Sequence, residues 1–335
     1  MSKAYGLSGL VLIALTLVPI VAEPFTYRAN AAQAASLKVG VLKFGTVNWE
    51  LNVVKRHGLD QSEGVELEVL GLASKNATSV ALQAGEVDMI VTDWVWVSRQ
   101  RAEGARYAFV PFSAAAGAVV VPANSPASGL RDLKGKRLGI AGGPLDKSWL
   151  LLQAFAKQEL GFDAAKEIEV VFAAPPLLNE QLLAGRLDAV LNFWHFTARL
   201  EAAGLRRLVE IPDVTRALGI EMEVPLIGYV FDERWAEENR EALLGFFRAS
   251  REAKRILRAS DEEWELLKPL MKVEDEITFR ALRDRYRAGI PQRWGGDEHE
   301  AAAQLFAILA RQGGEKLVGR AATLQDGTFW PHVDY

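Results

Sequence analysis

The chain contains an internal repeat with a period of about 100 residues. Residues 82–104 and 182–204 align without a gap, and most positions that differ exchange one apolar residue for another. The identical pairs are Leu82/Leu182, Ala84/Ala184, Gly85/Gly185, Asp88/Asp188, Trp94/Trp194, Arg99/Arg199, Ala102/Ala202 and Gly104/Gly204. The repeating units of solenoids have roughly 20–50 residues, so this period is too long for a solenoid. The repeat therefore predicts two similar lobes.

Each copy reads as strands that alternate with helices. The expected strands of the first copy are 37–42, 65–70 and 87–91, and its expected helices are 49–57 and 76–84. A strand-to-helix turn is expected at Asp93 and, in the second copy, at Asn192. This alternation implies βαβ units and parallel sheets. The predicted fold class is α/β, with two similar lobes, a hinge and a ligand cleft between them.

Two segments predict that the chain crosses between the lobes. Residues 119–140 combine Pro, Ser and a charged turn, and residues 223–231 read as a return strand. The segment after them is mostly helical, with an apolar stripe at a 3.6-residue period over 243–257. We therefore place the first lobe at 37–120 plus 225–335 and the second lobe at 121–224.

The N-terminal segment has the layout of a secretory signal peptide. Lys3 precedes an almost unbroken apolar run over 7–22, and Ala-x-Ala patterns follow at 29–31 and 32–34. The alternative is a membrane anchor, but 16 helical residues span about 24 Å and a bilayer core about 30 Å. We expect a signal peptide at 1–35, with cleavage between Ala29 and Ser36 and export of the mature chain.

Composition and motifs argue against several classes of function. The chain has no Cys, which removes thiol catalysis, Cys-based zinc sites and iron–sulfur clusters. A net charge of −4 does not favour nucleic-acid binding. Residues 297–300 read Asp-Glu-His-Glu, which is typical of a helix cap as well as of a metal cluster. We therefore expect no enzyme activity, no metal and no cofactor.

The order and spacing of five segments resemble type II periplasmic solute-binding proteins of ABC importers. Within them, the nitrate/sulfonate/taurine and thiamine-pyrimidine group is the most similar. The segments are LKVGVLKFGTVNWELNVVKRHGLD (37–60), LQAGEVDMIVTDW (82–94), LRDLKGKRLGIAGGPLDKSWLLLQAF (130–155), LLAGRLDAVLNFW (182–194) and ENREALLGFFRASREAKRIL (238–257). The resemblance implies a monomer in the periplasm that captures a small organic ligand by hinge closure and delivers it to an ABC permease in the inner membrane.

In open α/β sheets, ligands bind beyond the carboxyl ends of the strands, where helices begin with free N–H groups. This rule gives a set of candidate ligand-binding residues. They are Thr46, Asn48, Trp49, Ser74, Asn76, Asp93, Trp94, Asp146, Lys147, Ser148, Asn192, Trp194, His195 and Tyr229. Other roles stay open: the tryptophans and Tyr229 also suit core packing, and Asp93, Asp146 and Ser148 also suit helix caps.

The candidate residues favour one chemical class of ligand. Asp93 and Asp146 would repel a small anion, whereas Trp94 and Trp194 suit a planar ring. We therefore expect a planar or amine-bearing ligand, such as a pyrimidine. An alkanesulfonate, taurine or nitrate is the alternative ligand, although no Arg lies at 45–48 or 146–148. Alternative functions are an enzyme that resembles thiamine-pyrimidine synthases, which carry a Cys-rich motif that this chain lacks, and a sensory binding protein.

Overall fold

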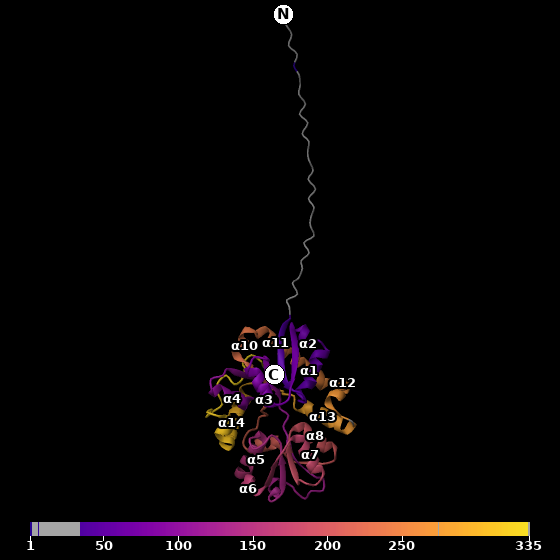
Figure 1. Ribbon diagram of the computed structural model, residues 1–335, viewed down its shortest axis with the longest axis vertical. Coiled ribbons are helices and arrows are strands. Elements are labelled where there is room, and N and C mark those ends of the chain that lie inside the picture. Colours follow the sequence, from indigo (N-terminus) through magenta and orange to yellow (C-terminus); the bar gives the residue numbers. More distant parts are fainter. Residues whose placement is uncertain (2–5, 7–33, 274, 334–335) are drawn as a thin grey trace. The chain divides into compact units, whose positions relative to one another are not determined.

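The computed structural model describes residues 1, 6, 34–273 and 275–333. The expected signal peptide therefore lies almost entirely outside the described residues. The part of the chain that follows it forms two five-stranded sheets, each with its own helices (Figure 1). We name the two halves, each built around one sheet, the first lobe and the second lobe.

The first sheet has the strand order β2-β1-β3-β10-β4. Its strands are β1 (Ala35–Leu42), β2 (Val65–Leu72), β3 (Met89–Asp93), β4 (Tyr107–Ser113) and β10 (Ile227–Asp232). β1 is parallel to β2 and β3, whereas β10 is antiparallel to both β3 and β4. β10 comes last in the chain but lies inside this sheet.

The second sheet repeats this arrangement in the order β7-β6-β8-β5-β9. Its strands are β5 (Ala118–Val121), β6 (Arg137–Ile140), β7 (Glu169–Phe172), β8 (Ala189–Asn192) and β9 (Arg206–Glu210). β5 is antiparallel to β8 and β9. Both sheets are thus mixed, which corrects the expectation of parallel sheets, because one strand of each sheet arrives by a crossover from the other lobe. The first crossover lies between Ser113 and Ala118, before the expected boundary at 120 and not in the expected segment 119–140, which lies within the second lobe.

The helices follow the expected alternation. The helices around the first sheet are α1 (Val47–Arg56), α2 (Leu59–Ser62), α3 (Lys75–Gln83), α4 (Trp94–Ala102), α10 (Glu233–Glu238) and α11 (Arg240–Ala259). Those around the second sheet are the 3-10 turn Leu130–Leu133, α5 (Lys147–Gln158), α6 (Ala164–Glu167), α7 (Pro175–Leu183), α8 (Trp194–Ala202) and α9 (Ile211–Ala217). α11 buries Leu243, Phe246 and Leu257 against the first lobe, which confirms the apolar stripe.

The repeat is visible in the element boundaries. α3 and α7 start at Lys75 and Pro175, and α4 and α8 start at Trp94 and Trp194. The expected turns are confirmed, since β3 ends at Asp93 and β8 ends at Asn192. None of the helices within the described residues is long and apolar enough to cross a membrane.

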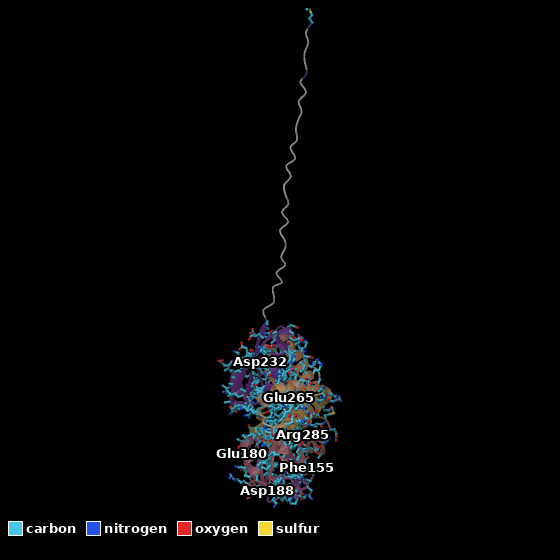
Figure 2. The ribbon with its side chains drawn as sticks, turned by 90° about the vertical axis from the view of Figure 1, so that its right-hand side faces the viewer. Phe155, Glu180, Asp188, Asp232, Glu265 and Arg285 are labelled. Carbon is cyan, nitrogen blue, oxygen red and sulfur yellow. The ribbon has the colours of Figure 1, made fainter. Side chains whose placement is uncertain are left out.

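The C-terminal helices α12 (Asp261–Met271), α13 (Glu276–Ala288) and α14 (Gly296–Val318) contact both lobes. α13 packs against α8, and α14 packs against α4 and α5 (Figure 1). Arg285 of α13 pairs with Glu201 of α8 at 2.6 Å, while Arg287 donates to the carbonyl of Leu257 in α11 at 2.9 Å. Figure 2 labels Arg285 between Glu265 of α12 and Phe155 of α5. The tail thus bridges the lobes, whereas the sequence assigned it to the first lobe alone.

Candidate ligand-binding site

A cavity of about 470 Å³ lies between the two lobes. The first lobe contributes the turn between β1 and α1 and the end of β3, and the second lobe contributes the loop between β6 and α5 and the start of α8. These are the carboxyl ends of strands in both sheets, as the strand-end rule predicts. The volume falls within the range of roughly 300–1,000 Å³ typical of small-molecule sites.

Both crossovers between the lobes also line the cavity. The first contributes residues 114–117, next to 112 and 113 at the end of β4, and the second contributes residues 220–224 and 226, next to 227 at the start of β10. At Gly117, a Cβ would lie only 2.0 Å from the carbonyl oxygen of Asn192, so no larger residue fits there without a shift of the backbone. The N–H of Ala114 donates to the carbonyl of Gly289 at 2.9 Å, which ties the first crossover to the end of α13.

The structure places half of the predicted site residues at this cavity. They are Thr46, Asp93, Asp146, Lys147, Ser148, Trp194 and His195. The others are absent from the cavity lining. They are Asn48, Trp49, Ser74, Asn76, Trp94, Asn192 and Tyr229.

Three of the residues outside the cavity lining are buried aromatic residues. Trp94 is fully buried, and its indole N–H donates to the carbonyl of Pro225 at 3.0 Å. The Tyr229 hydroxyl donates to the Glu50 carboxylate at 2.8 Å, inside the first lobe. Trp49 packs edge-on against Trp194, with 5.9 Å between ring centroids. Their role in the structure is core packing, the alternative that the sequence left open.

The polar residues outside the cavity lining have local partners or lie at the surface. Asn48 donates to the carbonyls of Leu42 and Gly45 and so closes the turn between β1 and α1. The Asn192 side chain donates to the carbonyl of Pro175 and to the side-chain oxygen of Asn179, both at 2.9 Å. Ser74 caps α3, and Asn76 is exposed.

Asp93 is both a helix cap and one half of an ion pair. Its Oδ1 accepts from the N–H of Trp96 at 3.0 Å, and its Oδ2 lies 2.7 Å from Lys147 Nζ. Burial alone would raise the pKa of Asp93, but Lys147, the charge of Lys75 and the Trp96 N–H together hold that pKa below its usual value. Asp93 is therefore ionised and already neutralised by Lys147.

Asp146 caps α5 and has different electrostatics. Its Oδ1 accepts from the N–H of Trp149 at 3.1 Å. Burial raises the pKa of Asp146, although the Trp149 N–H and the charges of Lys147 and Lys75 oppose this shift. A Cβ at Gly142 would approach Asp146 Oδ2 to 2.7 Å, and the φ of +81° at this position also favours glycine.

His195 lines the cavity as a neutral side chain. Burial lowers its pKa to about 4, and the charge of Arg199 adds to the shift. Its ring packs against Trp194 and Phe196, with centroid distances of 5.5 and 4.4 Å. Its Nδ1 is buried and has no hydrogen-bond partner among the described residues. His195 therefore presents a polar but uncharged edge at neutral pH.

A family profile described as NMT1/THI5-like matches residues 49–263, which is more than half of the chain. The chain belongs to the NMT1/THI5-like family. The match covers the second sheet, the first sheet apart from β1, much of the cavity lining and all of α11. No curated protein sequence matches this family member.

Solved structures show which fold this NMT1/THI5-like protein has. The periplasmic aliphatic sulphonate binding protein SsuA from Escherichia coli matches with a TM-score of 0.70 at 19% identity, over 88% of this chain and 92% of SsuA. The alkanesulfonate-binding protein SsuA from Xanthomonas axonopodis, solved with MOPS, matches with a TM-score of 0.66 at 18% identity, over 90% and 99% of the two chains. The desulfurization enzyme DSZB matches with a TM-score of 0.57 at 14% identity, over 83% and 92%. The fold is thus that of the periplasmic binding proteins, and it is shared by an enzyme.

Several charged residues of the cavity were not in the predicted set. Lys75 lies between Ser74 and Asn76, which were predicted, and Glu221 and Glu223 lie on the second crossover. Desolvation raises the pKa of Glu223. Glu221 and Glu223 could have been predicted from the sequence, because residues that join two lobes line the cleft between those lobes. Within the described residues of this NMT1/THI5-like protein, no group of His, Asp and Glu is arranged to hold a metal ion.

Proposed function

We propose that this protein is the solute-binding component of an ABC importer. It captures a small organic ligand between its lobes by hinge closure and delivers the ligand to a permease in the inner membrane. One observation carries the proposal: a single cavity is lined by strand ends of both sheets and by both crossovers. Rotation about the crossovers would open this cavity to solvent, which is how two-lobed binding proteins admit their ligands. The periplasmic binding proteins of the same fold support this role.

The location and state of the protein are part of the same proposal. The apolar run over 7–22 and the Ala-x-Ala patterns support export and cleavage between Ala29 and Ser36. We propose that the mature protein works as a monomer in the periplasm and has no enzyme activity. The absence of Cys separates it from the Cys-rich synthases that share the resemblance. A sensory binding protein would have the same cavity but dock on a receptor.

The charges of the cavity support a planar or amine-bearing ligand. Its walls include the rings of Phe112, Phe193 and Trp194, which offer faces and edges to a planar molecule. Its acidic side chains are Asp93, Asp146, Glu221 and Glu223, against the cations Lys75, Lys147 and Arg216. Arg216 is also paired with Asp213, which lies outside the cavity lining. The remaining negative excess favours a ligand with an amine or another N–H donor.

An alkanesulfonate or taurine is the second candidate. Lys75 has no carboxylate within ion-pairing distance among the described residues, so its ammonium is available to an anion. Lys75 is the first residue of α3, and the N-cap residue of α4 and the start of α5 line the same cavity. Helix N-termini favour negative charge. Nitrate is the least favoured of the anions, because four atoms would leave most of a cavity of about 470 Å³ unfilled.

Calorimetry of the mature protein tests the ligand. Benzamidine, benzamide and benzenesulfonate share one ring and carry a cationic, a neutral and an anionic group, and taurine and nitrate complete the panel. We expect benzamidine to bind most tightly, with a change in Trp fluorescence on closure. Tighter binding of benzenesulfonate or taurine would replace the amine-bearing ligand by a sulfonate and leave the importer role intact. A protein that neither binds nor closes on any compound of the panel, or on a periplasmic extract, would contradict the solute-binding role.

A further inference from the structure

Asp93 and Lys147 form a direct bond between the lobes. Asp93 ends β3 of the first sheet, and Lys147 begins α5 of the second lobe, 54 positions later in the chain. Their charged atoms are 2.7 Å apart, and the side chains are only 6% and 22% exposed. Because both residues line the cavity, this ion pair lies where a ligand binds rather than at the outer surface.

Asp93 and Lys147 are held in place differently by their own lobes. The Asp93 carboxylate is fixed on the first lobe by the N–H of Trp96. Lys147 stands in the first turn of α5, where the helix dipole disfavours a cation. The Asp146 carboxylate at the start of α5 also attracts Lys147, but the direct ion pair of Lys147 is with Asp93 of the other lobe. The pKa of Asp93 is held low, so this carboxylate is charged.

Separation of the lobes would break this pair. An exposed ion pair within one lobe contributes little to stability, because water and salt screen it. A sheltered pair that joins two lobes adds its attraction to the closed arrangement and loses it when the lobes separate. The edge-on packing of Trp49 against Trp194 is a second contact between the lobes, and this contact is apolar.

We propose that Asp93 is a positioning residue that latches the lobes across the cavity and holds the Lys147 ammonium ready for the ligand. A lysine has three N–H donors, so two remain for an acceptor on the ligand once Asp93 has taken one. The specificity part of this inference rests on the proposed function. The latch itself does not, since it concerns the lobes of the protein alone.

Distances between the lobes test the latch without any ligand. The chain has no Cys, so Glu86→Cys and Arg186→Cys give two unique sites for spin labels, at exposed and repeat-equivalent positions of the two lobes. Double electron–electron resonance then reports the closed and open populations.

Three variants test the latch with this measurement. Asp93→Asn keeps a good helix cap but removes the charge. Lys147→Met keeps the apolar stem of the side chain. Glu167→Gln is the control, because the Lys134–Glu167 pair at 2.8 Å lies within the second lobe.

We expect Asp93→Asn and Lys147→Met each to reduce the closed-to-open ratio on the order of tenfold, because this partly buried pair lies between the weak exposed pairs and the strong fully buried ones. The double variant should resemble either single variant, because the two changes remove the same bond. The control should keep the wild-type distances. Unchanged distances in both single variants, effects that add in the double variant, or a wild-type protein without a closed population would overturn the latch. Circular dichroism melts confirm that each variant is folded.

The same variants test the positioning of Lys147. Benzamide offers a carbonyl acceptor, and we expect its dissociation constant to rise about tenfold in Asp93→Asn and in Lys147→Met. If the latch results hold but benzamide affinity is the same in all variants, Lys147 does not contact the ligand and only the latch remains. If benzamide fails to bind the wild-type protein, the specificity part is wrong, while the distance measurement still decides the latch.

Discussion

Trp94 and Trp194 occupy equivalent positions in the two halves of the chain but lie in different surroundings. Trp94 is fully buried, with rings of Phe306 and Phe329 next to it at centroid distances of 6.5 and 6.0 Å. Trp194 lines the cavity and is 8% exposed. The difference arises because α14 covers Trp94, whereas Trp194 faces the cavity. The same residue type thus packs inside one lobe and forms part of the cavity wall in the other.

Substitution of the two tryptophans should separate these roles. Trp94→Ala should reduce the free energy of unfolding by about 3–5 kcal/mol, the usual cost of removing a buried Trp. Trp194→Leu keeps apolar volume and should reduce stability less, but it should weaken ligand binding by about 1–3 kcal/mol through loss of stacking. Urea unfolding and calorimetry measure the two quantities. A Trp94→Ala protein that is as stable as Trp194→Leu but binds more weakly would reverse the assignment.

The free energy of unfolding should decrease as the pH is lowered, because His195 takes up a proton more readily in the unfolded chain. The folded pKa is about 4, below the ordinary value of 6.5, so the unfolded chain binds more protons between these values. The contribution of the neutral His195 is fully present above about pH 6.5 and is lost as the pH falls toward 4, by about 1–3 kcal/mol in total. Chemical unfolding at several pH values gives the free energy of unfolding as a function of pH. The slope of this function should be smaller for His195→Gln than for the wild-type protein. Equal slopes would show that His195 is not protected from protonation.

A methyl group at Gly289 should disturb the hinge. A Cβ there would lie 2.4 Å from the Cβ of Ala115 on the first crossover. Gly289→Ala should therefore cost about 1–3 kcal/mol of stability, as overpacking does, and should change ligand affinity by moving the crossover. Gly296→Ala is the control, because no atom lies within 4 Å of its Cβ position. Thermal unfolding and calorimetry of both variants give the comparison, and equal effects would argue against the contact.

A buried ion pair stabilises the first lobe away from the ligand. Glu50 is fully buried and accepts from Lys254 and from Ser250, the latter at 2.6 Å. Burial lowers the pKa of Lys254, although Glu50 opposes the shift. Lys254→Met should reduce the free energy of unfolding by about 3–5 kcal/mol, because it leaves a buried carboxylate without its cation. The double variant with Glu50→Gln should recover part of the loss in urea unfolding, whereas additive losses would show that the two residues are not coupled.

The sequence predicted the elements of the fold well because local patterns determine them. Strand-end positions such as Asp93 and Asp146 were found because parallel strands end on one edge of a sheet. The mixed sheets were not predicted, because the partner of a strand depends on the crossovers rather than on its own residues. The same limit explains why Trp94 and Tyr229 were predicted to bind the ligand but are buried away from the cavity. Their positions in the chain are those of cleft residues. In the folded protein, α14 packs over Trp94 and Glu50 accepts a hydrogen bond from Tyr229, and both partners lie far away in the sequence.

The exchange of β5 and β10 between the sheets has a consequence for how the chain is made. A ribosome that has completed residues 35–121 has synthesised β1 to β5, but β10, which lies between β3 and β4, is still missing. The second sheet needs only β5 to β9, which are complete at Glu210, but the first sheet must wait for β10 at Ile227–Asp232 before its core can close. The first lobe therefore stays incomplete after the second sheet has all of its strands. Two separately expressed halves, divided in the loop at 122–129, should each be unstructured alone and regain the fold on mixing.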